Sequence, residues 1–184
     1  MKKVEHGKTF DRNAANPPAF EIFHNTVTEG YPEHWHTAIE IIMPTRGEYE
    51  VVVGKDSYNL KEGDIIMINS GVVHGMRFVS QGERIVMLVE PGCVENQEEM
   101  ETIFLRLPAI YFKKEDEEDP FHLFLRSQIL ELVREYDNEG AVMTHRICTG
   151  LKELFSEFGR KGFSDANAQN TFGAMKQQEY IEAG

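Results

Sequence analysis

Residues 34–47 of the 184-residue chain read HWHTAIEIIMPTRG, and residues 63–74 read GDIIMINSGVVH. Both stretches join an apolar run to turn residues, and together they hold three of the seven histidines. Side chains two residues apart along a β-strand point to the same face, because the side-chain period of a strand is two. A strand that starts at His34 therefore places His34, His36 and Glu40 on one face.

These three side chains form a candidate ligand set with His74 from the second stretch. Three imidazole nitrogens and one carboxylate oxygen suit a divalent transition metal such as Zn, Fe, Mn or Ni. We predict that His34, His36, Glu40 and His74 converge inside a barrel. The same groups without a metal would form a buried polar network that bonds directly to an effector or to ordered water. The spacing alone leaves both alternatives open.

Short alternating or apolar runs surround the two stretches and are separated by turns rich in Gly, Asn, Asp and Ser. Glycine supplies positive φ at such turns, and the short polar side chains bond to their own backbone there. The predicted strands are 20–28, 38–44, 49–53, 57–60, 65–68, 75–79 and 84–90. Many short strands at this spacing are typical of a sandwich or a small barrel.

The second half of the chain has a helical period. Residues 121–136 and 143–158 each carry one apolar stripe, and the turn 137–140 joins them into an amphipathic hairpin. A weaker helix is predicted over 97–107, a linker over 159–170 and a further helix over 171–182. Two long stripes exceed what one small barrel rim usually covers. We therefore expect a homodimer through the 121–158 hairpin.

The first stretch resembles the first conserved motif of cupins, H-x-H-x(3,4)-E-x(6)-G. His34, His36, Glu40 and Gly47 are all in register with that motif. The resemblance implies a double-stranded β-helix, or jelly-roll, barrel.

The second stretch resembles the second cupin motif, G-x(5)-P-x-G-x(2)-H, at Gly63, Gly71 and His74. It departs from the motif at Asn69, where cupins usually have proline, and at Phe78, where the closing asparagine would fall. The two motifs occur at the expected separation, and the resemblance covers about residues 20–90. The predicted fold class is thus mainly β with C-terminal α, a small cupin barrel followed by a helix hairpin.

With its helical half, the chain resembles the N-terminal effector domain of AraC-type transcriptional regulators. Residues 175–184, MKQQEYIEAG, resemble the opening of the DNA-binding domain in that family. The resemblance implies an effector-binding barrel with an N-terminal arm over 1–94 and a helical dimerisation region over 95–160. Residues 161–184 would then be a linker and the first helix of a DNA-binding domain whose remainder is missing from this chain.

The charge balance argues against direct contact with nucleic acid. The chain has 19 Lys+Arg against 31 Asp+Glu, a net charge of −12, which opposes binding to phosphate backbones. We expect DNA contact only through the missing C-terminal domain. No apolar run is long enough for a membrane span, and the N-terminus has no secretory h-region. These features predict a cytoplasmic protein with no membrane partner.

Residues outside the two motifs are weaker candidates. Cys93 and Cys148 are 55 positions apart and belong to no CxxC pair, so we expect free, buried thiols in a reducing compartment. The other histidines are expected to be surface or capping residues: His6, His24, His122 and His145.

The first functional hypothesis is a sensor that binds a small-molecule effector in the barrel. His and Glu side chains would hold the effector against Trp35 or Tyr49. An arginine near the rim (Arg46, Arg77 or Arg84) could take an anionic group, although solvation at the surface is the default expectation for each.

The second hypothesis is a metal-dependent cupin enzyme of the dioxygenase or isomerase type. The third is a storage or scaffold cupin without catalysis. The tail favours the sensor, because a stand-alone enzyme does not need a long hairpin and a linker. We therefore expect no enzymatic activity.

Overall fold

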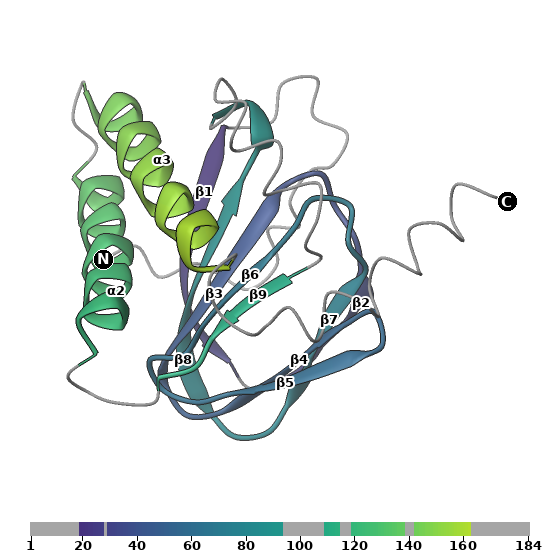
Figure 1. Cartoon of the computed structure of the whole chain (residues 1–184). Helices are drawn as coiled ribbons and strands as arrows, with labels where there is room; N and C mark the ends of the chain where they lie inside the picture. Colours follow the sequence, from purple (N-terminus) through teal and green to yellow (C-terminus); the bar gives the residue numbers. More distant parts are fainter. Residues whose placement is uncertain (1–18, 28, 94–108, 115–118, 139–141, 163–184) are drawn as a thin grey trace, which may run out of the picture.

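The computed structural model describes residues 19–27, 29–93, 109–114, 119–138 and 142–162 (Figure 1). Its elements, in chain order, are β1 (Phe20–Val27), β2 (Tyr31–His34), β3 (Ile39–Arg46), β4 (Tyr49–Val53), β5 (Asp56–Leu60), β6 (Ile65–Ile68), β7 (His74–Phe78), β8 (Gly82–Val89), the 3-10 helix η1 (Pro91–Cys93), β9 (Ala109–Phe112), α2 (Pro120–Asp137) and α3 (Met143–Gly162).

The strands form two antiparallel sheets that face each other. One sheet has five strands in the order β1-β8-β3-β6-β9, and the other has four in the order β2-β7-β4-β5. Strands that are consecutive in the chain, such as β2 and β3, thus belong to different sheets, as in a jelly roll. The predicted fold class, mainly β strands in a jelly-roll arrangement followed by a helix hairpin, is confirmed.

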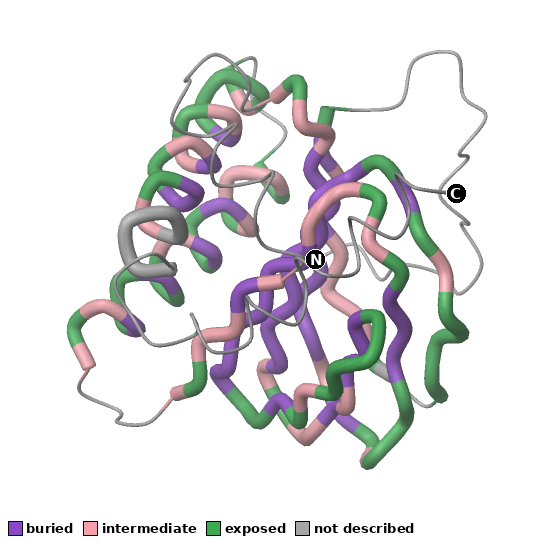
Figure 2. The backbone as a smooth tube through the Cα atoms, turned by 45° about the vertical axis from the view of Figure 1, so that its right-hand side comes forward, coloured by how far each residue is buried: buried purple, intermediate pink, exposed green. Residues whose placement is uncertain are grey.

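The five-stranded sheet is the middle of three layers. Its strand β3 is buried on both faces, which explains the nearly unbroken apolar sequence IEIIM. Ile42 points into the barrel, where it packs with Val51, Ile66 and Leu88. Residues of the opposite face, Ile39 among them, pack against the helices. Figure 2 shows buried positions continuing from these strands into the inner sides of α2 and α3.

The hairpin of α2 and α3 covers the outer face of the five-stranded sheet (Figure 1). Leu132 and Leu151 are almost fully buried in this layer, in one cluster with residues of β3, β6 and β8. A Cβ atom on Gly150 would lie 2.9 Å from Leu132 Cδ2, so the two helices approach closely at that residue. The apolar stripes are therefore covered within the chain, and a partner copy is not needed to bury them.

Two strand predictions were wrong in detail. His34, His36 and Glu40 do not share one strand, because β2 ends at His34 and β3 starts at Ile39. The four residues between them carry the chain from one sheet to the other. The strand β9 was not predicted, since its four residues follow the helical pattern assigned to 97–107.

Parts of the sequence predictions lie outside the described residues. These are the N-terminal arm, the helix over 97–107 and the helix over 171–182. Residues 159–162, predicted as the start of a linker, belong to α3 instead, and the rest of the predicted linker lies outside the described residues. Among the described helices, none is both long and apolar enough to cross a bilayer.

A buried carboxylate ties β9 to the rest of the barrel. Asp64 Oδ2 accepts hydrogen bonds from the Lys61 amide and from Tyr111 Oη, both at 2.8 Å. Asp64 Oδ1 accepts from the Lys114 amide at 2.7 Å. Burial and the bond to Asp64 raise the pKa of Tyr111, so its hydroxyl remains a donor.

Replacing Asp64 with Ala should lower the free energy of unfolding by about 3 kcal/mol, because a charged acceptor of three hydrogen bonds is lost. The measurement is urea unfolding followed by circular dichroism. Glu62→Ala in the same turn is the matched control, since Glu62 is exposed and should change stability by less than about 0.5 kcal/mol. Equal stability of the two variants would contradict a structural role for Asp64.

Candidate metal centre

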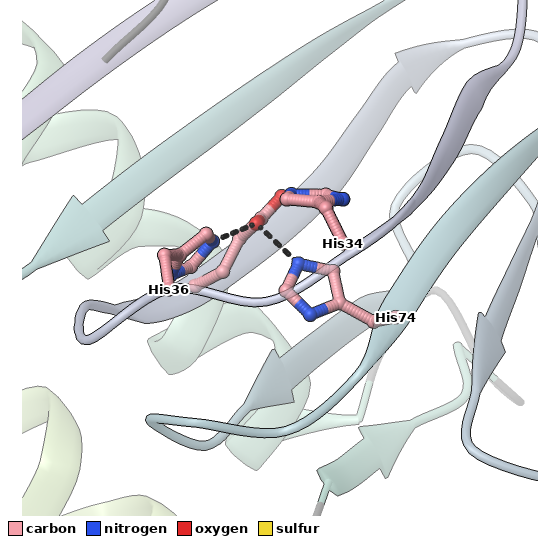
Figure 3. Close-up of side chains that lie close together, drawn as sticks. His34, His36 and His74 are labelled. Atoms are coloured by element: carbon pink, nitrogen blue, oxygen red, sulfur yellow. Dashed lines mark hydrogen bonds and ion pairs between the residues drawn. The ribbon is translucent and has the colours of Figure 1, made fainter. Parts of the chain in front are cut away.

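Four of the predicted site residues meet at one end of the barrel. One ligand atom of each of His34, His36, Glu40 and His74 lies within 4.8 Å of the other three. Figure 3 shows the three imidazoles arranged around one carboxylate oxygen. The predicted convergence of these residues, which lie on β2, on the crossover after it, on β3 and on β7, is present in the structure.

Backbone pairing brings the segments together. His34 at the end of β2 is the cross-strand partner of His74 at the start of β7. His36 lies in the crossover, where its carbonyl accepts a hydrogen bond from the Gly71 amide at 2.8 Å. Gly71 has φ 74°, a left-handed conformation that favours glycine, so the turn before His74 fixes the position of His36. Glu40 is the second residue of β3 and points into the barrel.

One oxygen of Glu40 bonds to two imidazoles. Oε2 lies 3.0 Å from His36 Nε2 and 2.9 Å from His74 Nε2. Burial alone would raise the pKa of Glu40, but the hydrogen bonds from His36 and His74 and the charges of these rings lower it to about 2. The carboxylate is therefore ionised at neutral pH, as a metal ligand must be.

The second nitrogen of each ring is bonded to the backbone. Nδ1 of His34 lies 3.0 Å from the Pro32 carbonyl oxygen, that of His36 lies 2.9 Å from the Ala38 oxygen, and that of His74 lies 2.8 Å from the Val72 oxygen. A carbonyl oxygen only accepts, so Nδ1 carries the proton in each case. A ring that is neutral in this form has its lone pair on Nε2. The hydrogen bonds from His36 and His74 to Glu40 therefore need a second proton on each ring, and a bound metal would take the place of those protons. This outer-shell arrangement is the one that orients histidines for metal binding.

The four side chains therefore fit a divalent transition metal in two respects. Their donor atoms are of the kinds that such a metal binds, and hydrogen bonds to the backbone hold the imidazole rings in place. His36, Glu40 and His74 are buried, whereas His34 is partly exposed at the side of the cluster that faces solvent. Burial and the nearby His74 lower the pKa of His34 and favour its neutral, ligating form.

Two predicted effector-binding residues are not members of the cluster. Trp35 follows His34 on the crossover, and 58% of its surface is exposed. Tyr49 is buried on β4, but it pairs with Phe78, whereas His74 pairs with Val53 at the opposite end of that strand. Effector contact by Trp35 or Tyr49 stays a prediction.

The three candidate arginines have different environments. Arg46 is exposed and pairs with Glu83, and Arg77 is exposed and pairs with Glu50. Arg84 is buried and belongs to no ion pair within the described residues. The surface position expected by default is thus right for the first two and wrong for Arg84.

One histidine outside the cluster was also misjudged. His122 is buried rather than at the surface, and its Nε2 donates to the Gly63 carbonyl oxygen at 2.5 Å. The bond holds α2 against the turn before β6. Nothing in the local sequence distinguishes His122 from an exposed helix residue except its place on the apolar stripe, three positions before Leu125 and seven before Ile129.

Comparison with known proteins agrees with this geometry. Residues 25–90 match the Cupin domain family, so the chain contains a cupin domain that includes all four cluster residues. No curated protein sequence matches the chain.

Solved structures with a similar fold cover different shares of the chain. Apo ToxT from Vibrio cholerae aligns with a TM-score of 0.52 at 9% identity over 79% of this chain and 58% of ToxT. A second ToxT structure aligns with a TM-score of 0.51 at 10% identity over 77% of this chain and 56% of ToxT. A cupin-2 domain containing protein from Shewanella frigidimarina aligns with a TM-score of 0.37 at 16% identity over 41% of this chain and 76% of that protein. This chain thus spans less than two thirds of ToxT, and the likeness shows the fold alone.

Proposed function

We propose that this chain is the effector-sensing part of an AraC-type transcriptional regulator, and that its barrel binds a small molecule with the help of a divalent transition metal. The metal (Zn, Fe, Mn or Ni) would be held by His34, His36, Glu40 and His74. The observation that carries the metal assignment is the set of three Nδ1–H groups bonded to backbone carbonyls. It directs Nε2 of His36 and of His74 at one buried carboxylate, and a ligand atom of His34 lies within 4.8 Å of the same group.

The regulator assignment is supported by the extent of the fold likeness. ToxT, a regulator of the AraC family, matches over 79% of the chain, which is more than the cupin domain at 25–90. Contact with DNA would be made by another domain of the regulator, because this chain has a net charge of −12.

The cluster residues have different roles in the proposed binding of metal and effector. When bound, the metal supplies Lewis acidity and an open position for an oxygen or nitrogen atom of the effector. Glu40 balances part of the positive charge. His34, the partly exposed member, lies where an effector would approach from solvent.

Elemental analysis tests the metal. Protein purified without chelator or nickel resin should contain close to one equivalent of Zn, Fe, Mn or Ni. Less than about a tenth of an equivalent, unchanged after each metal is added and excess is removed, would contradict the proposal. The four groups would then bind the effector directly.

A metal-dependent enzyme of the dioxygenase or isomerase type is the second candidate, since the same donor set fits a catalytic metal. A sensor needs a second element that transmits the bound state, and the hairpin on the outer face of the five-stranded sheet supplies one. Oxygen consumption by the iron-loaded protein with an added organic acid would favour the enzyme.

A homodimer is part of the proposed function. The stripes of the hairpin are covered by the barrel, so a partner copy would use the exposed apolar residues of α2. Leu123 and Leu130 are seven positions apart, hence on one face, and both remain more than a third exposed. Phe124 lies beside them and is also exposed.

We expect Leu123→Glu with Leu130→Glu to give a folded monomer, because the charges enter the seam between copies without touching the core. Light scattering measures the molar mass of this double variant and of the unmodified protein. The measurement is made at about tens of micromolar, where a homodimer of modest affinity is populated. Glu131→Gln on the same helix is the control. A monomer for the unmodified chain would refute the dimer.

A further inference from the structure

Arg84 is a buried cation inside the barrel. It is two residues before Val86 and four before Leu88 on β8, and both of these apolar side chains belong to the core between the two sheets. By strand alternation Arg84 points to the same side. Only 7% of its surface is exposed.

No carboxylate neutralises this guanidinium at ion-pair distance among the described residues. Its Nη1 contacts the thioether of Met76, a weak acceptor, and its Nε has no hydrogen-bond partner. The carbon at the centre of the guanidinium lies 5.5 Å from the centroid of the Tyr49 ring. A cation–π contact offsets only part of the cost of burial.

Burial lowers the pKa of Arg84, while Glu40 and Tyr49 act in the opposite direction. Glu40 lies beyond ion-pair distance of Arg84 and does not neutralise it. An arginine keeps its charge in proteins, so a buried guanidinium with open donors favours an incoming anion.

We propose that Arg84 recognises a carboxylate on the effector, so that the sensed molecule is a small organic acid. The inference rests on the proposed effector function and names the class of ligand. Arg84 is the only buried arginine or lysine among the described residues, and one buried cation fits a single carboxylate better than a phosphate dianion. Arg46 and Arg77 do not serve this role, because each is exposed and already paired with a glutamate.

Met76 is the side chain that an incoming acid would displace. Its thioether contacts Nη1 of Arg84, and Met76 belongs to the core between the two sheets. A methionine side chain adapts readily, so an acid that moved it aside would reach the guanidinium.

Calorimetry with matched probes tests the proposal. Benzoate and butyrate are compared with benzamide and butyramide, which have the same shapes without the charge. We expect the unmodified protein to bind at least one acid at least tenfold more tightly than its amide, and Arg84→Met to abolish that preference. Arg84→Lys should keep part of it, which guards against a misfolded Met variant. Arg77→Met is the control and should behave as the unmodified protein.

The metal content of each variant separates this proposal from the metal proposal. Arg84 is not a ligand, so Arg84→Met should keep its metal while it loses the preference for acids. A preference for acids in protein that binds no metal would leave the Arg84 proposal standing alone. Equal affinity for each acid and its amide, or an unchanged preference in folded Arg84→Met, would overturn it.

A separate observation concerns the two cysteines. Cys93 ends η1 next to the barrel, and Cys148 lies on α3, yet their Sγ atoms are 2.6 Å apart. Both are free thiols and partly buried. Contact between the only two cysteines of the chain, 55 positions apart, joins the barrel to the hairpin at one point.

We infer that Cys93 and Cys148 form a reversible disulfide when a peroxide is present. Each thiol loses one electron and one proton, the S–S bond forms, and hydrogen peroxide is reduced to two molecules of water. Burial and the neighbouring Cys148 raise the pKa of Cys93 to about 12, so the reaction should be slow at neutral pH and faster at alkaline pH.

Peptide mapping after treatment with hydrogen peroxide tests the disulfide. We expect a cross-linked pair of peptides containing Cys93 and Cys148, loss of both free thiols, and a rise in the melting temperature of about 5 °C that a reductant reverses. Cys148→Ser should give none of these. Two thiols that stay free, or oxidation to sulfinic acid without the cross-link, would overturn the inference.

Discussion

Replacing His74 with Ala should weaken Zn²⁺ binding at least about 100-fold, because loss of a direct ligand costs no less than loss of an outer-shell partner. His74 is almost fully buried and bonds to Glu40, so the truncated site has no solvent-exposed group to replace the missing imidazole. No other His, Cys, Asp or Glu of the described residues belongs to the cluster, so water would take the place of the imidazole without a fixed orientation.

The chain contains its own reporter for this measurement. Trp35 is the single tryptophan, and it lies between two of the proposed ligands in the sequence. Titration with Ni²⁺, a quencher, should therefore change its emission in the unmodified protein and not in His74→Ala. Competition with Zn²⁺ then gives the affinity.

His24→Ala is the matched control for His74→Ala. His24 is partly exposed on β1 and lies outside the cluster, so this variant should bind Zn²⁺ as the unmodified protein does. Circular dichroism shows whether each variant is folded. A folded His74→Ala protein with undiminished Zn²⁺ affinity would contradict the proposed site.

Replacing Leu151 with Glu should unfold the protein or lower its free energy of unfolding by roughly 4 kcal/mol or more, since an unpaired charge enters an apolar core. Leu151 is 1% exposed and packs in the cluster shared by α2, α3 and the five-stranded sheet. The side chain has no route to solvent that keeps the hairpin on the sheet.

Thr149→Glu on the exposed side of α3 is the control for Leu151→Glu and should change stability by less than about 0.5 kcal/mol. Urea unfolding measures both variants, and light scattering measures their mass. A Leu151→Glu protein that stays folded and becomes a monomer would show that the stripe is a seam between copies. That outcome would contradict the intrachain packing described above.

The sequence by itself determined the elements of the fold and the identity of the cluster. Alternating apolar residues and turn glycines such as Gly47 and Gly63 predicted nearly all the strands, because a strand pattern and a positive-φ turn are both local properties. The resemblance of residues 34–47 and 63–74 to the two cupin motifs predicted which four residues form the cluster. Metal binding by these residues stays a prediction.

The sequence predicted less well how these residues meet. One strand from His34 to Glu40 would place His34, His36 and Glu40 on the same face. The structure instead brings them together from β2, β3 and the crossover between these strands, which belong to different sheets. The break in the crossover depends on pairing with β7 and on the Gly71 amide, which are distant in the chain. Local pattern contains no information on such pairings.

Only the tertiary structure decided what each amphipathic or charged residue faces. The stripes with Leu132 and Leu151 predict burial, but a helical period says nothing about whether the covering surface is a second copy or the same barrel. The sequence does not distinguish the environments of Arg46, Arg77 and Arg84. Their places on the strands do: the first two form exposed ion pairs, and Arg84 is buried with no carboxylate partner among the described residues. Burial is a property of the packed chain, because it depends on which other segments exclude water from the side chain.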